Sequence, residues 1–187
     1  GVRRRMVLVA YAREAIGGFL RSLWDSGLRL SQSLHTPADC WTLDPKNVEL
    51  SISLLDRRFL IGDSGLFESC GVRLQKFLRT NREALIRHLC QITEQRHSKY
   101  HNTIYHLEPN IKETPGGVRD LNLIGWLRAL RQADVKDSMD LGEARDFLSV
   151  LRCHLHYKTG RDSNVLTFDF QEALSSDRAA WMRTYYR

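Results

Sequence analysis

Apolar residues recur every three or four positions through most of the chain after residue 44. This spacing places them on one face of an α-helix, so most of the chain is predicted to be helical. The positions between them are polar or charged, as expected for helices that bury one face. The apolar faces are Val48, Ile52, Leu55 and Phe59; Leu85, Leu89 and Ile92; Leu121, Ile124, Leu127 and Leu130; and Leu141, Ala144, Leu148, Leu151 and Leu155.

Polar and turn-forming residues lie where these helices are expected to begin and end. The first apolar face is expected to continue to Gly62, and the last expected helix covers residues 179–186, after a stretch at 165–170 that reads as extended. The predicted starts and stops are Asp44 with Pro45 in the first turn, Asp63 or Ser64, the capping box Thr80 to Glu83, Asp140, and Gly160 as a C-terminal stop.

The first 35 residues have a different pattern. A short apolar and β-branched run at Met6–Tyr11 predicts a buried strand, and Leu28–His35 alternates apolar and polar residues as a strand does. Residues 15–24 between them have helical spacing. We therefore expect an α+β, mostly α fold in which a small sheet subdomain over residues 1–43 packs against a helical domain over residues 44–187.

The segment 105–121 interrupts the helical pattern with prolines, glycines and charges. Pro109 and Pro115 exclude helix, and Gly116 and Gly117 supply a turn before an apolar helical run that begins at Val118. The loop is therefore predicted to deliver the N-terminus of a helix.

Charged residues concentrate in the same loop. Free N–H groups at the helix start, with Lys112 and Arg119 beside them, would attract a phosphate or a carboxylate. Glu108, Glu113 and Asp120 lie within the same few residues. This density of charge fits either the polar wall of an active site or a solvated loop followed by a capped helix.

Composition narrows the class of partner. The 187-residue chain carries a formal net charge of +6, which suits a polyanionic ligand. Only Arg3–Arg5 forms a compact basic cluster, so the charge pattern does not favour nucleic acid. A nucleoside triphosphate is the better anionic partner, although charge alone does not select it. No apolar run is long enough to span a membrane and no signal-peptide pattern opens the chain, so a cytoplasmic location is expected. The four cysteines are widely spaced, as reduced packing thiols are.

Histidines offer a weaker candidate site. His97 and His101 lie four residues apart on an expected helix and His106 follows them, but no carboxylate or cysteine completes a metal-ligand set at helical spacing. His154 and His156 are two residues apart and point to different sides of a helix. Surface or loop-packing roles are therefore favoured for these histidines.

The loop sequence from Glu108 to Asp120, EPNIKETPGGVRD, resembles the signature of the bacterial PII-protein uridylyltransferase/uridylyl-removing enzymes. A looser version of this motif, Gly-Gly-x-Arg-Asp/Glu, occurs in the glutamine-synthetase adenylyltransferases. Further segments match the first family in the same order: Leu23–Leu28, Ser33–Thr36, Leu54–Asp63, Ala144–Leu148, His154–His156, Leu166–Gln171 and Met182–Arg187.

The resemblance implies a nucleotidyltransferase-type mixed sheet beside the helices, and transfer of UMP from UTP to a tyrosine of the PII nitrogen-signalling protein with Mg²⁺ as cofactor. Lys112 and Arg119 are expected to contact phosphate, and Glu108 and Asp120 to orient these cations or to contact ribose or metal-bound water. The glycines would let the backbone approach the nucleotide. The nucleotide-binding residues expected on this basis are Glu108, Asn110, Lys112, Gly116, Gly117, Arg119 and Asp120.

One departure from the family affects the chemistry. Family members carry a Gly-Gly-x-Gly-Arg turn and an Asp-x-Asp strand after the first strand, whereas this sequence runs from Ala12 directly to Arg13. Without these carboxylates, nothing near the expected sheet can hold Mg²⁺. Either a segment of the natural protein is absent from this sequence, or the chain is a degenerate interaction module without transferase activity. An adenylyltransferase-like relative is the other alternative.

Overall fold

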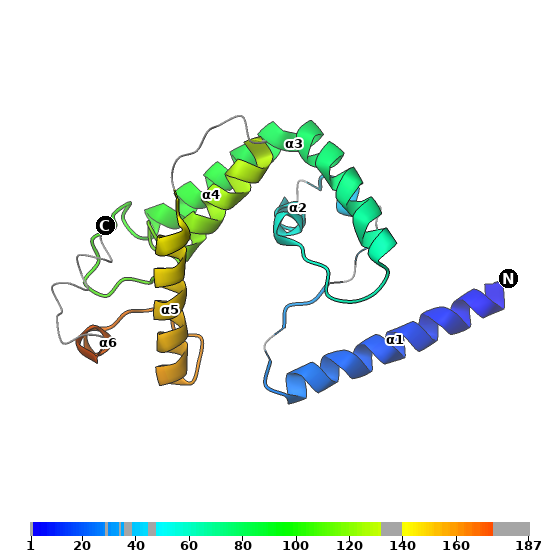
Figure 1. Ribbon diagram of the computed structural model, residues 1–187, viewed down its shortest axis with the longest axis horizontal. Helices are drawn as coiled ribbons and strands as arrows, with labels where there is room; N and C mark the ends of the chain where they lie inside the picture. Colours follow the sequence, from blue (N-terminus) through cyan, green and yellow to red (C-terminus); the bar gives the residue numbers. More distant parts are fainter. Residues whose placement is uncertain are drawn as a thin grey trace. The chain divides into compact units, whose positions relative to one another are not determined.

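The computed structural model describes residues 2–28, 30–33, 35, 39–44, 48–131 and 140–173, with the backbone alone described for residues 2–12 and 39. The chain divides into two compact units, Gly1–Thr36 and Pro37–Arg187. Every regular element of the described residues is a helix (Figure 1). The prediction of a mostly α fold is therefore confirmed, while the division into functional domains at residue 43 stays a prediction.

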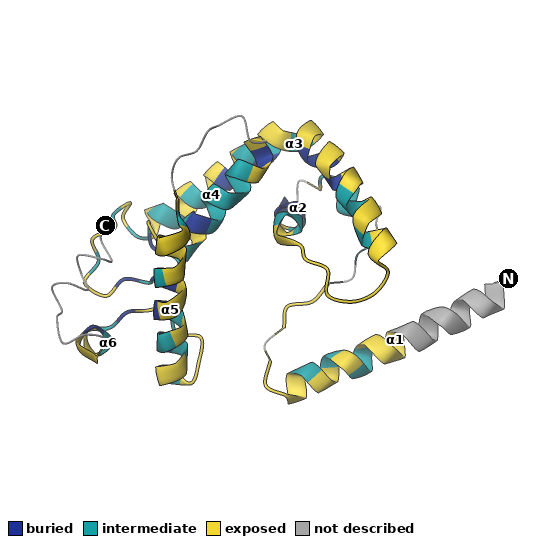
Figure 2. Ribbon diagram, viewed as in Figure 1, coloured by how far each residue is buried: buried dark blue, intermediate teal, exposed yellow. Residues whose placement is uncertain are grey.

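The described residues of the first unit contain one helix, α1 (Val2–Asp25). The strand predicted at Met6–Tyr11 is wrong, because these residues lie inside α1, and the described residues of 28–35 form no strand either. A strand needs a neighbour to pair its backbone groups, whereas a helix pairs them internally. The expected mixed sheet is thus not found in the described part of the chain. From residue 13 onward the α1 side chains are exposed or half-buried (Figure 2), and Phe19 is 64% exposed.

The second unit begins with the short helix η1 (Asp39–Trp41), followed by α2 (Val48–Ser53) and η2 (Leu54–Asp56). The apolar face predicted to reach Gly62 ends early, because Arg57 is extended with φ −62° and ψ 144°. Phe59 leaves the helix and is 43% exposed. Its ring packs instead on Phe67, with the ring centroids 5.5 Å apart.

The longest helix, α3, covers Ser64–Ser98 without a break. The capping box predicted at Thr80–Glu83 is wrong as a helix start, since these residues lie in the middle of α3. The Asn81 amide donates to the Phe77 carbonyl in the preceding turn at 2.9 Å, so it does not cap a new helix. A continuous helix keeps one apolar face through both halves, and this burial outweighs the local capping signal. The buried residues of that face are Leu74, Phe77, Leu78, Leu85 and Leu89.

Three further helices lie in the described part of this unit: α4 (Val118–Arg131), α5 (Gly142–Thr159) and α6 (Phe168–Ala173). One core cluster joins α2, α3 and α4, and a second lies between α4, α5 and the central loop. The first comprises Val48, Ile52, Leu74, Phe77, Leu78, Leu85, Leu89 and Leu130; the second comprises Ile111, Leu121, Leu148, Leu151, Leu155 and Leu166. The apolar faces predicted for α4 and α5 thus supply core residues in the structure.

Two predicted helix ends are confirmed: the Asp63 side chain accepts the Leu66 N–H at 2.9 Å, and Gly160 ends α5 with φ +62°. Asp140, predicted as the cap of α5, lies one residue before the N-cap Leu141 and accepts the N–H of Gly142 at 2.8 Å. The stretch predicted to be extended over 165–170 becomes α6 from Phe168 onward. Pro45 and the helix predicted at 179–186 lie outside the described residues. None of the described helices is long and apolar enough to cross a membrane.

The core cluster around α3 makes a first prediction. Leu85 has no exposed surface, so Leu85→Ala is expected to lower the free energy of unfolding by about 2–5 kcal/mol through lost burial and the cavity left behind. The matched control is Leu60→Ala, whose side chain is 75% exposed and for which a change within about 0.5 kcal/mol is expected. Chemical denaturation measures both, and equal losses would contradict the assigned core.

Candidate functional site

The central loop is anchored by an isolated antiparallel bridge between Asn110 and Val165. The Ile111 N–H donates to the Asn164 carbonyl and the Leu166 N–H donates to the Pro109 carbonyl, each at 2.9 Å. Pro109, Ile111 and Leu166 are fully buried beside this bridge. The loop is therefore tied to the segment that follows α5, more than 50 residues later in the chain.

Asn110 shapes the turn that follows the bridge. Its side-chain oxygen accepts the N–H groups of Lys112 at 3.1 Å and Glu113 at 3.0 Å. Its carbonyl oxygen accepts both the N–H and the hydroxyl of Thr114, at 3.0 Å and 2.8 Å. In this geometry the two oxygen atoms of Asn110 hold the loop itself.

The two glycines allow the chain to close against the start of α4. Gly116 has φ +82°, in the left-handed region, and a Cβ at Gly117 would lie 2.7 Å from the Ile111 carbonyl oxygen. This close approach lets the Val118 N–H donate to that carbonyl at 3.0 Å and the Arg119 N–H donate to the Lys112 carbonyl at 3.1 Å. The first N–H groups of α4 are thus used by the loop, and the predicted seat of free N–H groups for a phosphate is wrong.

A cluster that we call the Asp120 clasp joins the end of α3 to the start of α4. It comprises Arg96, His97, Gly116 and Asp120. The Asp120 carboxylate accepts a hydrogen bond from Arg96 Nη2, lies 3.1 Å from His97 Nε2 through both oxygens, and accepts the Gly116 N–H at 2.7 Å. Arg96 Nη1 also donates to the Glu113 carbonyl at 2.9 Å, so one guanidinium holds both the loop and the helix.

The clasp changes the acidity of Asp120. Burial alone would raise the pKa of this carboxyl, but hydrogen bonds from Arg96, the Gly116 N–H and His97 outweigh burial and hold the pKa below its usual value of 3.8. Arg96 and Asp120 are only 12% and 18% exposed, so water screens this pair little. Asp120 is therefore a structural anion, and it does not orient Lys112 or Arg119 as expected from the sequence.

Glu113 takes over that orienting role. Its carboxylate accepts a hydrogen bond from Arg119 Nε at 2.9 Å and lies 3.7 Å from Lys112 Nζ. The structure thus brings both predicted phosphate-contacting cations to one carboxylate. Glu108 lies apart from this group: its Oε1 accepts the Phe168 N–H at 2.8 Å, at the start of α6.

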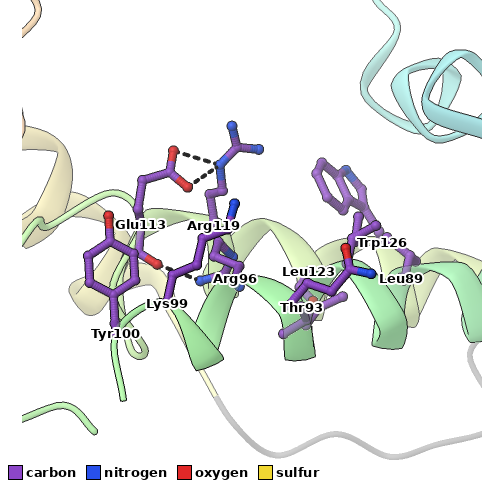
Figure 3. A pocket seen from close by; sticks show the side chains of 11 residues that line it. Leu89, Thr93, Arg96, Lys99, Tyr100, Glu113, Arg119, Leu123 and Trp126 are labelled. Carbon is purple, nitrogen blue, oxygen red and sulfur yellow. Dashed lines mark hydrogen bonds and ion pairs between the residues drawn. The ribbon is translucent and has the colours of Figure 1, made fainter. Parts of the chain in front are cut away.

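A cavity of about 390 Å³, which we call the α3–α4 groove, opens beside this group (Figure 3). Cations and Glu113 gather at one end of the view, and Trp126 and Leu89 lie at the other. The lining residues are Leu89, Ile92, Thr93, Gln95, Arg96, Lys99, Tyr100, Glu113, Arg119, Leu123 and Trp126. Of the predicted site residues, only Arg119 lines it. Arg96 and Lys99 were not predicted from the sequence as site residues. The one signal that could have found them is that they lie on a polar extension of one face of α3.

The described residues do not form a metal site. No group of three or more His, Cys, Asp or Glu side chains in this part of the chain could hold a metal ion. His97, considered as a metal ligand from its spacing, binds Asp120 instead, in agreement with a loop-packing role. The Mg²⁺ that the family resemblance implies therefore has no ligand set among the described residues.

The close approach at Gly117 makes a second prediction. Gly117→Ala places a methyl group against the Ile111 carbonyl, so we expect the free energy of unfolding to fall by about 1–3 kcal/mol. Gly125→Ala, in the middle of α4 with only Arg145 Nη2 at 4.0 Å, is the control and is expected to be neutral or stabilising by about 0.5–1 kcal/mol. A Gly117→Ala protein as stable as the control would contradict the packed loop in denaturant titrations.

The lowered pKa of Asp120 makes a third prediction. Because the pKa in the folded state lies below 3.8, the stability contributed by this group is present above that pH and is lost as pH falls through the folded pKa. Asp120→Asn is expected to cost about 3–5 kcal/mol near pH 5, because Arg96 is left without its buried partner. The difference in the free energy of unfolding between the parent and Asp120→Asn should become smaller toward pH 2.

Denaturation at several pH values measures this difference, and exposed Asp146→Asn is the control. The free energies of unfolding of the parent and Asp146→Asn should differ by no more than about 0.5 kcal/mol at every pH. A difference for Asp120→Asn that is independent of pH would mean that the carboxylate charge does not stabilise the clasp.

Comparison with known proteins identifies the family. A family model described as GlnD PII-uridylyltransferase matches residues 84–186, a range that includes the central loop, the Asp120 clasp and the lining of the groove. No solved structure shows significant similarity to the chain.

Curated relatives agree with the family model. The bifunctional uridylyltransferase/uridylyl-removing enzyme of Methylococcus capsulatus is 36% identical over 179 aligned positions, covering 87% of this chain and 20% of the relative. That of Nitrosococcus oceani is 36% identical over 178 positions, with the same coverage of each chain. That of Burkholderia mallei is 34% identical, covering 92% of this chain and 23% of the relative. The chain thus spans about a fifth of the length of these relatives, and it belongs to the PII-uridylyltransferase family.

Proposed function

We propose that the helices of the second unit form a nucleotide-binding wall of a cytoplasmic uridylyltransferase that transfers UMP from UTP to a tyrosine of a PII-type signalling protein. In this reaction the tyrosine hydroxyl releases its proton to water as its oxygen bonds to the α-phosphorus of UTP, the bond from that phosphorus to its bridging oxygen breaks, and pyrophosphate leaves. Family membership supports the proposal, because the family model and the relatives are named for uridylyl transfer. The same names favour it over adenylyl transfer.

The observation that carries the proposal is the way Glu113 holds Arg119. Glu113 accepts from Nε only, and within the described part of the chain the terminal Nη groups of Arg119 have no hydrogen bond or ion pair. A guanidinium has further N–H donors on those groups, in a geometry that suits phosphate oxygens. The side chain is 48% exposed, so a ligand can reach it. Figure 3 shows the guanidinium of Arg119 projecting beyond the Glu113 carboxylate.

The other predicted site residues support this arrangement in different ways. Lys112 adds a second positive charge beside Glu113 and is 33% exposed. Asn110, Gly116 and Gly117 fix the loop backbone, so the cations need little further ordering when a phosphate binds. Glu108 joins the loop to α6 and is a positioning residue in this proposal.

The chemical step needs groups that the described residues do not supply. The sequence lacks the family's Asp-x-Asp between Ala12 and Arg13, where α1 is continuous, and the described part of the chain contains no metal-ligand cluster. This part of the chain is therefore proposed to bind and orient the triphosphate, and the measurable property of the 187-residue chain is UTP binding.

Arg119→Ala gives a fourth prediction. Loss of charge-assisted hydrogen bonds to phosphate, worth about 1.5–3 kcal/mol, should weaken UTP binding by about 10-fold or more. The free energy of unfolding should change by less than about 1 kcal/mol, because the Arg119–Glu113 pair is half exposed. Calorimetric titration with UTP measures the affinity.

Arg87→Ala is the matched control for the Arg119 variant. Arg87 is a 76% exposed arginine on α3 that does not line the groove, and its removal should leave UTP affinity unchanged. The intact mass of the assayed protein should equal 21.7 kDa, which ensures that the measured UTP affinity comes from these 187 residues alone. Absence of UTP binding by the parent, or equal affinities of the parent and Arg119→Ala, would overturn the assignment.

A further inference from the structure

The α3–α4 groove has the size of a small-molecule site. Its volume of about 390 Å³ lies within the range of ligand pockets, roughly 300–1,000 Å³. Its walls come from one face of each helix: residues 89, 92, 93, 96 and 99 of α3 and its C-cap, and residues 119, 123 and 126 of α4. Since a helix rises about 1.5 Å per residue, the groove extends roughly 15 Å along α3 and roughly 10 Å along α4.

Each wall changes from cationic to apolar in the same direction. The Asp120 clasp joins the end of α3 to the start of α4, so Arg96 and Lys99 lie at the same end of the groove as Arg119. At the other end, Leu89 on α3 faces the part of α4 that carries Trp126. Figure 3 shows this separation, with Lys99, Arg96 and Arg119 grouped apart from Trp126 and Leu89. A ligand that fills the groove must therefore be anionic at one end and apolar at the other.

The cationic end has positive charge that the described residues do not neutralise. Among the described residues that line the groove, Glu113 is the one carboxylate, and it is shared between Arg119 and Lys112. Arg96 is held by Asp120. The Lys99 ammonium has no ion pair or hydrogen bond in the described part of the chain. Two cations, Lys99 and Arg119, are thus positioned to bind an anion that carries more than one charge.

The apolar end presents a fixed aromatic ring. Trp126 Nε1 donates to Asp56 Oδ2 at 2.8 Å, and the indole is half-buried against the α2–α3–α4 core. Because this bond satisfies the polar atom of the ring, the remaining surface that faces the groove is apolar and suits a flat ring stacked on it. Thr93 and Gln95, in the lining of α3, supply a hydroxyl and an amide that can donate and accept hydrogen bonds.

We propose that the α3–α4 groove binds a nucleoside triphosphate lengthwise, with its phosphates at Lys99 and Arg119 and its base against Trp126. This inference rests on the proposed function and extends it, because it adds Lys99 to the phosphate contacts and assigns the base a platform on α4. The polarity of the groove favours a nucleotide over a bare polyphosphate, which would leave the apolar end unfilled.

The test compares UTP with inorganic tripolyphosphate, which carries the phosphates without the base. In calorimetric titrations the parent should bind UTP about 10-fold more tightly than tripolyphosphate, the gain expected from stacking one base on an aromatic ring. Trp126→Leu should remove this gain in affinity by weakening the binding of UTP and leaving that of tripolyphosphate unchanged. Trp126→Phe should keep most of the gain. Lys99→Ala should weaken both ligands about 10-fold, whereas Lys158→Ala, on α5 outside the groove, should change neither.

The outcomes separate this inference from the proposed function. Equal binding of UTP and tripolyphosphate by the parent, or equal weakening of both by Trp126→Leu, would overturn the base platform and leave the Arg119 assignment standing. Unchanged affinities in Lys99→Ala would overturn the phosphate end of the groove. Failure of the parent to bind either ligand would overturn both proposals, and binding of an acidic peptide in place of UTP would identify the groove as a protein-docking site.

Discussion

The Asp120 carboxylate is the contact on which the arrangement of the second unit depends. It receives Arg96 and His97 from the end of α3 and the Gly116 N–H from the loop, while its own backbone lies in the first turn of α4. Removing this charge would leave a mostly buried guanidinium without its partner, which costs far more than the loss of a surface ion pair. One anion therefore ties the end of α3, the start of α4 and the loop between them together.

The loop separates structural from chemical roles. Many of its backbone groups and the side-chain oxygen of Asn110 are used in the Asn110–Val165 bridge, in the turn and at the start of α4, so these groups are not available to a ligand. The polar groups left for a ligand are the ends of long side chains, Lys112 and Arg119, joined by Lys99 from the end of α3. A stiff backbone that carries a few cations is suited to binding an anion, because little order is lost when the ligand arrives.

Two errors in the sequence-based prediction have the same origin. The capping box at Thr80–Glu83 and the β-branched run at Met6–Tyr11 are local signals, and each is overridden in the structure by a longer helix. In α3 the helix gains a continuous buried face from Leu74 to Leu89. In α1 it satisfies the backbone without a partner strand. Local propensity amounts to a fraction of a kcal/mol per residue, so either effect is large enough to reverse it.

The sequence by itself determined the helical faces of α4 and α5, the caps at Asp63 and Gly160, and the loop with its conspicuous charges, because each depends on residues close in the chain. Only the tertiary structure decided how those charges are paired. Asp120 meets Arg96 from 24 residues away and Glu108 meets Phe168 from 60 residues away. One carboxylate binds a structural cation and another leaves its cation accessible to a ligand. The packing of α3 against α4 decides which carboxylate does which, and the residue spacing within the loop does not contain that information.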